Sequence, residues 1–181
     1  MSYILKAPPA TIWITGLSAA GKTTLATALF NELKNTYSNV EFWDGEFLRE
    51  KAKNLNYSTR SRCELAFHNA QLCIKANKRG KCIVITGITH KAYTRRKIRG
   101  IFHHYLEIFL QSDVQTCASR DFKGNYEKAL RGEYDNFIGV TEPYEEYEEY
   151  DFKIETNRMG ITECTQTLLG FVLPRLEEMD Q

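Results

Sequence analysis

The 181-residue sequence lacks long hydrophobic runs, paired cysteines and any marked excess of charge. No segment approaches the roughly 18 apolar residues that a membrane-spanning helix requires, and the first ten residues lack the apolar core of a signal peptide. A formal net charge of +1 gives no overall field that would attract a nucleic-acid polymer or a membrane surface. The five cysteines form no CxxC pair, which is typical of reduced thiols rather than of a disulfide framework or a zinc site. We therefore expect a cytoplasmic protein with no nucleic-acid or membrane partner.

Apolar, β-branched segments alternate along the chain with segments of helical periodicity. This alternation favours an α/β fold, a mainly parallel five-stranded sheet with helices on both faces. Residues 82–86 read Cys-Ile-Val-Ile-Thr, a continuous run expected of a central strand buried on both faces. A chain of 181 residues suits one domain and is too short for two, so we expect residues 1–181 to form a single domain. Strands are predicted at residues 11–15, 40–43, 81–86, 105–110 and 151–156, and helices at residues 22–37, 61–79 and 161–179.

Residues 16–23 read Gly-Leu-Ser-Ala-Ala-Gly-Lys-Thr and match the P-loop pattern GxxxxGK[ST] between a predicted strand and a predicted helix. Glycines let such a loop turn tightly, so that backbone N–H groups and the helix N-terminus point at phosphate groups. In this pattern Lys22 reaches the β- and γ-phosphates, and the Thr23 hydroxyl coordinates Mg²⁺. The sequence therefore predicts a nucleoside triphosphate and Mg²⁺, bound by Gly16, Ser18, Ala19, Ala20, Gly21, Lys22, Thr23 and Thr24.

Other classes of P-loop protein fit the sequence less well. A GTPase needs an Asn-Lys-x-Asp segment, and the nearest match, residues 77–80, reads Asn-Lys-Arg-Gly. An ATPase motor usually has an acidic residue at the end of the central strand, where this chain reads Ile85-Thr86-Gly87. Residues 120–150 break the helical and strand periodicity, and a long segment of this kind is typical of the lid that a kinase closes over its nucleotides. These features favour a small-molecule P-loop kinase with a lid at about residues 120–150.

Asp44 directly follows the predicted strand at residues 40–43. A carboxylate there would lie at the carboxyl edge of the sheet beside the P-loop, where α/β proteins bind ligands. It could accept the proton of an acceptor hydroxyl and help to hold Mg²⁺. An Asp-Gly turn after a strand would explain the same two residues, so the interpretation depends on the surrounding sequence.

That surrounding sequence resembles the adenylylsulfate kinase family over nearly the whole chain. The family pairs a P-loop of the form GLSGxGK[ST]T with a DGDxxR segment, and this chain has GLSAAGKTT at residues 16–24 and DGEFLR at residues 44–49. An aromatic-Ser pair and an arginine follow, here Tyr57-Ser58 and Arg62. The lid pattern of the family, RDxKGxYxKAxxGxxxxFxGxxxPYE, is closely matched by residues 120–145. This lid is the most specific signal in the sequence.

The resemblance implies transfer of the ATP γ-phosphoryl group to the ribose 3′-hydroxyl of a nucleotide that carries a second anionic group on its 5′-phosphate. It implies that Asp44 and Lys22 are catalytic, with Asp44 orienting or deprotonating the hydroxyl, and that Arg120 is a lid arginine near ATP. Tyr57 and Phe137 would be the aromatic faces that hold the base. A homodimer is also implied. The implied acceptor-binding residues are Asp44, Arg49, Tyr57, Arg62, Leu65, Thr89, Lys123 and Phe137.

The sequence departs from the family on the acceptor side. An asparagine and an arginine pair that follow the acceptor-binding arginine in the family are replaced by Leu65, Phe67 and His68. The usual Ser-Pro-Tyr after the third strand is Thr89-His90-Lys91. Two acceptors therefore stay open: adenylylsulfate, which we expect first, and another modified nucleotide such as the cytidine diphosphoramidate of bacterial capsule synthesis. A nucleotide-binding module without kinase activity is a further alternative.

Two charged segments are expected to be mostly solvated. The basic cluster, Lys91, Arg95, Arg96, Lys97 and Arg99, reads as an exposed helix face, with Arg95 as the one member that matches a family arginine. The acidic tract, residues 142–151, reads as a solvated margin of the lid.

Overall fold

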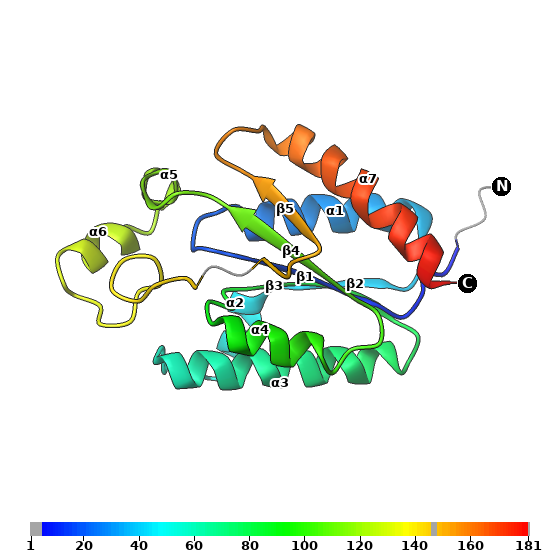
Figure 1. Cartoon of the computed structure of the whole chain (residues 1–181), viewed down its shortest axis with the longest axis horizontal. Helices are drawn as coiled ribbons and strands as arrows, with labels where there is room; N and C mark the ends of the chain where they lie inside the picture. Colours follow the sequence, from blue (N-terminus) through cyan, green and yellow to red (C-terminus); the bar gives the residue numbers. More distant parts are fainter. Residues whose placement is uncertain (1–4, 146–147, 181) are drawn as a thin grey trace.

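The computed structural model describes residues 5–145 and 148–180, which form a five-stranded sheet flanked by helices (Figure 1). All strand pairs are parallel, in the order β2-β3-β1-β4-β5, so the predicted α/β fold is confirmed. The strands are β1 (Thr11–Gly16), β2 (Val40–Trp43), β3 (Cys82–Gly87), β4 (Tyr105–Gln111) and β5 (Phe152–Glu155). The helices are α1 (Lys22–Thr36), α2 (Gly45–Lys51), α3 (Thr59–Asn77), α4 (Ala92–Arg99), α5 (Val114–Arg120), α6 (Asn125–Leu130) and α7 (Ile161–Met179).

Helices cover both faces of the sheet, and the strand sequences show why. Successive side chains of a strand point to opposite faces. In β1, Ile12 and Ile14 belong to the hydrophobic cluster that packs against α1 and α7, whereas Trp13 belongs to the cluster on the α3 and α4 side. Figure 1 shows α1 and α7 on one side of the sheet and α3 and α4 on the other. Because both faces of the sheet are covered, every residue of β1 and all but the last residue of β3 are buried.

The three predicted long helices correspond to α1, α3 and α7, the helix face expected for the basic cluster is α4, and α2, α5 and α6 were not predicted. One of these, α2, begins where the Asp44 side chain accepts hydrogen bonds from the N–H groups of Glu46 and Phe47. Helix α3 begins at Thr59, two residues before the predicted start at residue 61, because Ser58 is its N-cap. Within residues 5–145 and 148–180, no helix combines the length and the apolarity needed to cross a membrane.

The lid segment lies at the same end of the molecule as the P-loop (Figure 1). Part of it is helical, since α6 occupies residues 125–130, where the sequence showed only a broken pattern. Tyr126 is buried and its hydroxyl donates a 2.9 Å hydrogen bond to the carbonyl of Ser18 in the P-loop. Gly139 has a φ of +96°, and a Cβ there would come within 2.9 Å of the Leu17 side chain. The lid segment therefore packs directly on the P-loop.

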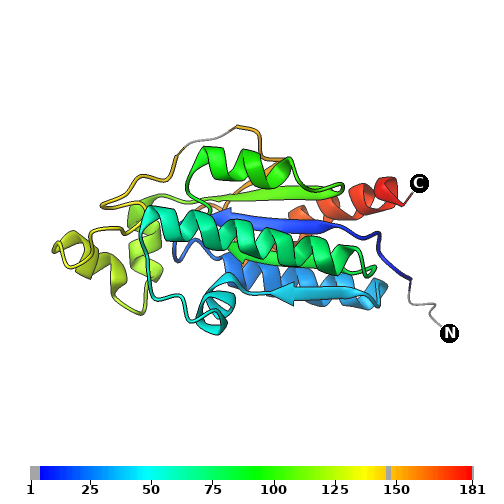
Figure 2. The same ribbon diagram turned by 90° about the horizontal axis from the view of Figure 1, so that it is seen from below.

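The acidic tract and the basic cluster face each other, and the expectation that both are mainly solvated holds only in part: Arg96, Lys97 and Glu149 are exposed, whereas Arg95 is buried and Lys91 and Arg99 are half-buried. Their charges neutralise one another across a large sequence separation, which leaves less net charge exposed than either segment alone predicts. Residues 146–147 of the tract lie outside the described residues, and Figure 2 shows the rest running alongside α4. The ion pairs are Lys91 with Glu142 (2.7 Å) and Glu145 (3.1 Å), Arg96 with Glu149 (2.8 Å), and Arg99 with Asp151 (2.8 Å).

Candidate active site

The predicted P-loop connects β1 to α1 at the carboxyl edge of the sheet. Gly16 packs so tightly that a Cβ would lie 2.6 Å from the Leu110 carbonyl oxygen, and Gly21, with a φ of +95°, is the N-cap of α1. Ala19 adopts a φ of +55°, a left-handed conformation that a side chain rarely tolerates. The carbonyl of Ala20 accepts a 3.0 Å hydrogen bond from the Thr156 hydroxyl at the end of β5. The loop is thus held in a strained shape by its neighbours.

Lys22 is the first residue of α1, and its ammonium donates a 2.5 Å hydrogen bond back to the Leu17 carbonyl. Desolvation lowers the pKa of this lysine to about 8, against the opposing effect of Cys117, Asp44 and Glu46. A phosphate group bound at the loop would reverse that effect, because a nearby negative charge favours the charged lysine. The groups around Lys22 therefore balance its positive charge only in part, and a bound phosphate would pair with that charge.

Asp44 joins three elements at the edge of the sheet. Its Oδ2 accepts hydrogen bonds from the hydroxyls of Thr23 (2.7 Å) and Thr86 (3.1 Å), while its Oδ1 caps α2. Burial alone would raise the pKa of Asp44, but the hydrogen bonds from Thr23, the backbone of Phe47, Thr86 and the backbone of Glu46 outweigh it and lower the pKa below its usual value. Asp44 is therefore ionised at neutral pH and is held against the first turn of the P-loop helix.

Thr86 was missed as a site residue by the sequence analysis. It ends the apolar part of β3, and the register Trp43 to Ile85 between β2 and β3 places it next to Asp44. Its hydroxyl also accepts a 3.0 Å hydrogen bond from the N–H of Gly45. Thr86 could have been found from the sequence as a polar residue at the end of the predicted central strand. Neighbouring parallel strands end at the same edge of the sheet, so this residue would be expected near Asp44.

Arg49, Tyr57 and Arg62 lie together on the α2 and α3 side. The guanidinium carbons of Arg49 and Arg62 lie 4.7 Å and 5.1 Å from the centroid of the Tyr57 ring. Desolvation and the charge of Arg49 lower the pKa of Arg62 to about 10, so both arginines remain charged at neutral pH. Arg62 also donates a 3.0 Å hydrogen bond to the carbonyl of Asn136 in the lid segment. The lid therefore reaches this cationic cluster.

Two further lid residues occupy distinct positions. Lys123 pairs with Glu46 at 2.7 Å, two residues after Asp44, and both side chains are about half exposed. Phe137 packs edge-on against Tyr126, with ring centroids 4.8 Å apart. The structure thus brings Lys123 to α2 and Phe137 to α6, both at the P-loop end of the molecule.

The remaining predicted donor residue, Arg120, ends α5. It donates a 2.7 Å hydrogen bond to the Thr156 carbonyl, and the Thr156 hydroxyl in turn contacts the P-loop at Ala20. Thr24 is exposed in the first turn of α1. These contacts place Arg120 one residue away from direct contact with the P-loop.

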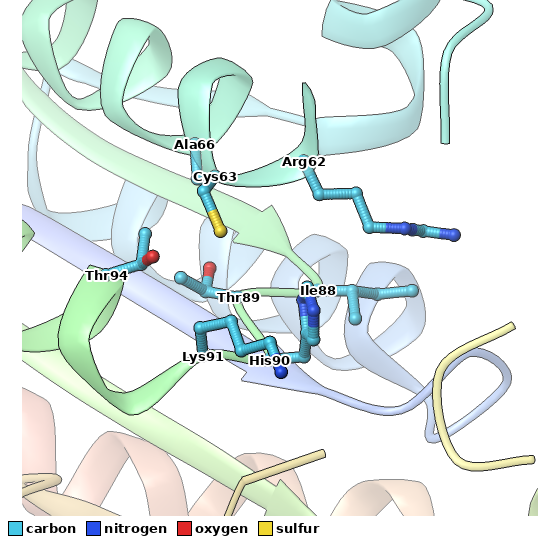
Figure 3. Close-up of a pocket in the computed structure, with 8 residues that line it drawn as sticks. All are labelled: Arg62, Cys63, Ala66, Ile88, Thr89, His90, Lys91 and Thr94. Atoms are coloured by element: carbon cyan, nitrogen blue, oxygen red, sulfur yellow. The ribbon is translucent and has the colours of Figure 1, made fainter. Parts of the chain in front are cut away.

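A narrow pocket, too tight in this structure to hold a water molecule, lies between α3 and the loop that joins β3 to α4 (Figure 3). Arg62 enters it from α3, and Thr89 from the opposite loop, where its hydroxyl accepts a 3.1 Å hydrogen bond from Trp13. Leu65 is buried but does not line this pocket, and His68 is exposed. The lining residues are Arg62, Cys63, Ala66, Ile88, Thr89, His90, Lys91 and Thr94.

Comparison with protein families matches residues 8–155 to the adenylylsulphate kinase model. The chain belongs to the adenylylsulfate kinase family. It is 35% identical over 159 residues to the adenylyl-sulfate kinase of Deinococcus deserti, covering 87% of this chain and 88% of that protein. It is also 35% identical over 140 residues to the cytidine diphosphoramidate kinase of Campylobacter jejuni, covering 75% of this chain and 80% of that protein.

The fold agrees with the family assignment. The structure of the Mycobacterium tuberculosis APS kinase in complex with AMPPNP and APS has a TM-score of 0.84 to this chain at 26% identity, and the match covers 93% of this chain and 99% of that one. The predicted P-loop kinase fold is therefore confirmed. The family consists of ATP-dependent kinases, so the chain is a kinase rather than a GTPase or an ATPase motor.

Proposed function

We propose that the protein transfers the γ-phosphoryl group of ATP to the ribose 3′-hydroxyl of a nucleotide, with adenylylsulfate as the first candidate acceptor and 3′-phosphoadenylylsulfate as the product. The main support is the position of Asp44, which is hydrogen-bonded to Thr23 of the P-loop helix and to Thr86 of β3. A carboxylate in that position lies between a phosphate-binding loop and the cationic cluster of Arg49 and Arg62.

The donor side would use the P-loop and a divalent cation. Lys22 would bind the phosphates, and the whole loop would orient them through its backbone N–H groups. The Thr23 hydroxyl and the Asp44 carboxylate, 2.7 Å apart, are oxygen donors of the kind that Mg²⁺ prefers, so the residues fit this ion. Bound Mg²⁺ would neutralise charge on the phosphate oxygens. Arg120 would approach ATP from the lid.

The chain's own contribution to the transfer step would be positioning and charge neutralisation. Asp44 has a lowered pKa, which makes it a weak base, and phosphoryl transfer depends little on proton abstraction before the transition state. Asp44 would therefore orient the 3′-hydroxyl and accept its proton late. Arg49, Arg62 and Lys123 would neutralise the acceptor's anionic groups, and Tyr57 and Phe137 would hold its base by stacking.

A second candidate acceptor is cytidine diphosphoramidate, which would place the protein in capsule biosynthesis. The loop after β3 reads Thr89-His90-Lys91 instead of the family's Ser-Pro-Tyr, and Leu65 replaces an asparagine. The 35% identity to a cytidine diphosphoramidate kinase supports the same candidate. These differences concern only the acceptor, so both candidates share one donor mechanism.

We further propose that the protein acts in the cytoplasm as a homodimer of single-domain subunits spanning residues 1–181. The homodimer is based on the resemblance described above, and light scattering coupled to size-exclusion chromatography would test it. A monomeric mass at assay concentration would contradict it.

The proposed function is tested by a product assay with ATP, Mg²⁺ and a panel of acceptors led by adenylylsulfate and cytidine diphosphoramidate. A tenfold preference in kcat/KM, about 1.4 kcal/mol, would identify the acceptor. Asp44→Asn should abolish transfer and leave ATP binding intact. Asp113→Asn is a matched control, because Asp113 also caps a helix, α5, but its side chain hydrogen-bonds only to Thr116 and Asn157 among residues 5–145 and 148–180. Undiminished turnover of Asp44→Asn, or ATP binding without any phosphorylated product, would refute the proposal.

A further inference from the structure

Lys91 is an enclosed cation beside the pocket between α3 and the β3–α4 loop. Its side chain is 16% exposed, and its ammonium is held by two carboxylates, Glu142 at 2.7 Å and Glu145 at 3.1 Å. Figure 3 shows Lys91 and His90 on one side of the pocket and Arg62 on the other. Arg62 belongs to the cluster assigned above to the acceptor. Lys91 is therefore a second cation at the same pocket, contributed by a different element.

The neighbouring His90 supplies an independent sign that the pocket takes a ligand. Its side chain is 1% exposed, and its Nε2 makes no hydrogen bond within residues 5–145 and 148–180. Desolvation, with Lys91 and Arg62, lowers the pKa of His90 to about 4, so the ring is neutral at pH 7. Glu142 Oε1 is 3.6 Å from Nε2, beyond hydrogen-bond reach. Buried polar atoms are normally satisfied, so an unpartnered nitrogen lining a pocket points to a missing partner.

The two carboxylates differ in where they lie around Lys91. The Glu145 carboxylate accepts a 2.8 Å hydrogen bond from Ala92 N–H at the start of α4. Glu142 is tied to the lid segment, since its backbone N–H donates to the Phe137 carbonyl and its carbonyl accepts from Gly139, and its side chain also contacts Thr59. Its Oε1 is the oxygen that faces both the Lys91 ammonium, at 2.7 Å, and the unpartnered His90 Nε2, at 3.6 Å. Glu142 is therefore the carboxylate that occupies the position beside His90.

We propose that Lys91 binds the distal anionic group on the acceptor's 5′-phosphate, and that Glu142 occupies Lys91 until the acceptor displaces it. This inference depends on the proposed function. A carboxylate presents anionic oxygens to an ammonium in the same way as a sulfate or a phosphoramidate group does. Lys91 would replace a positive charge that the family carries on α3, where this chain has Phe67 and His68.

The inference predicts effects of opposite sign for the two partners, measured as KM for the preferred acceptor. Lys91→Met keeps the aliphatic chain and removes the charge, so it should raise the acceptor KM at least tenfold with the ATP KM unchanged within twofold. Glu142→Gln removes the competitor and should lower the acceptor KM about threefold or more. In the Lys91→Met background, Glu142→Gln should have no further effect, because the two changes act on one contact.

Arg96→Met is the matched control. Arg96 lies on α4, which begins directly after Lys91, and it pairs with Glu149 of the acidic tract at 2.8 Å, so this variant also weakens the contact between α4 and the tract. Its acceptor KM should stay within twofold of the wild-type value. Thermal unfolding of all four variants checks that each is folded at the assay temperature.

The possible outcomes separate the inference from the function that it depends on. If the wild-type chain phosphorylates no acceptor of the panel, the proposed function fails and this inference fails with it. If the wild type is active but Lys91→Met leaves the acceptor KM within twofold, the inference alone is overturned. An acceptor KM that rises in Glu142→Gln, or in Arg96→Met as much as in Lys91→Met, would show a structural ion pair and would also overturn it.

Discussion

Gly45 directly follows Asp44 and packs against the backbone at the end of β3, and Gly45→Ala tests how strictly this packing fixes Asp44. A Cβ on residue 45 would lie 2.2 Å from the Thr86 carbonyl oxygen, 3.1 Å from its carbonyl carbon and 3.3 Å from the Gly87 Cα. All three neighbours are backbone atoms, so no side chain can rotate away. A carbon and a carbonyl oxygen need about 3.3 Å, and the two strand ends must separate by about 1 Å.

The size of the effect follows from the contacts that this separation breaks. The hydrogen bonds from Gly45 N–H to the Thr86 hydroxyl (3.0 Å) and from that hydroxyl to Asp44 (3.1 Å) would both be lost. Each contributes about 1 kcal/mol, and the overpacking adds about 1 kcal/mol or more. A loss of about 3 kcal/mol lowers the Tm of a chain of this size by about 6–12 °C. A 1 Å displacement of Asp44 should lower kcat by about 100-fold.

The assay compares Tm, ATP affinity and kcat of Gly45→Ala with those of Gly160→Ala. Gly160 has an ordinary φ of −71° and no atom within 4 Å of its would-be Cβ, so the same chemical change there should lower Tm by only about 2 °C, the cost of alanine at the N-cap of α7, and leave kcat near the wild-type value. ATP affinity of Gly45→Ala should fall little, because the loss concerns Asp44 rather than the P-loop. A Gly45→Ala chain with wild-type Tm and kcat would refute the close packing of β2 against β3 and the positioning of Asp44 by it.

Two further predictions concern the P-loop. Ala19→Gly should leave the Tm unchanged or raise it slightly, because the strain of alanine at φ +55°, about 1 kcal/mol, offsets the greater unfolded-state entropy of glycine; a clear fall in Tm would contradict the left-handed conformation. Since desolvation lowers the pKa of Lys22 to about 8 in the ligand-free chain, ATP binding at pH 8.5 should take up about 0.7 proton as the phosphates restore the charged lysine. Calorimetry in buffers of different ionisation enthalpy measures this proton uptake, which should vanish in Lys22→Met. The apparent ATP affinity of the wild type should fall as the pH rises above 8, and that of Lys22→Met should not.

The strands and long helices were predictable because their signals are local. A β-branched run such as residues 82–86 and a 15-residue helix such as α1 each contain enough residues to show a period. The helices that were missed, α2, α5 and α6, have six or seven residues, about two turns, and no period can be established over so short a segment. The start of such a helix depends instead on a single N-cap residue, such as Asp44 for α2. An aspartate before a glycine is equally expected in a turn that follows a strand.

The donor site was also easier to predict than the acceptor site, because its residues lie close together in the sequence. The donor residues lie mostly in one contiguous segment, residues 16–24, so a single motif describes both their identity and their spacing. The acceptor residues come from α2, α3, the β3–α4 loop and the lid segment, and their proximity depends on pairs separated by some 50 residues, such as Lys91 and Glu142. No periodic pattern records such a pair, which is why two oppositely charged segments that neutralise each other were read as two solvated surfaces.

Because the acceptor residues come from several elements, loss of the family's asparagine and arginine pair from α3 does not by itself mean that the acceptor site has lost its positive charge. An anion requires positive charge at a point in space, not at a position in the sequence. Phe67 now packs on the α4 side with the Lys97 ammonium 4.5 Å from its ring centroid, and His68 is exposed, so neither offers a charge to the pocket. Lys91 reaches the same pocket from the loop after β3. A cation supplied by a different element can therefore sustain anion binding after the motif has gone, and the acceptor KM of Lys91→Met, rather than the match to the family pattern, measures whether it does.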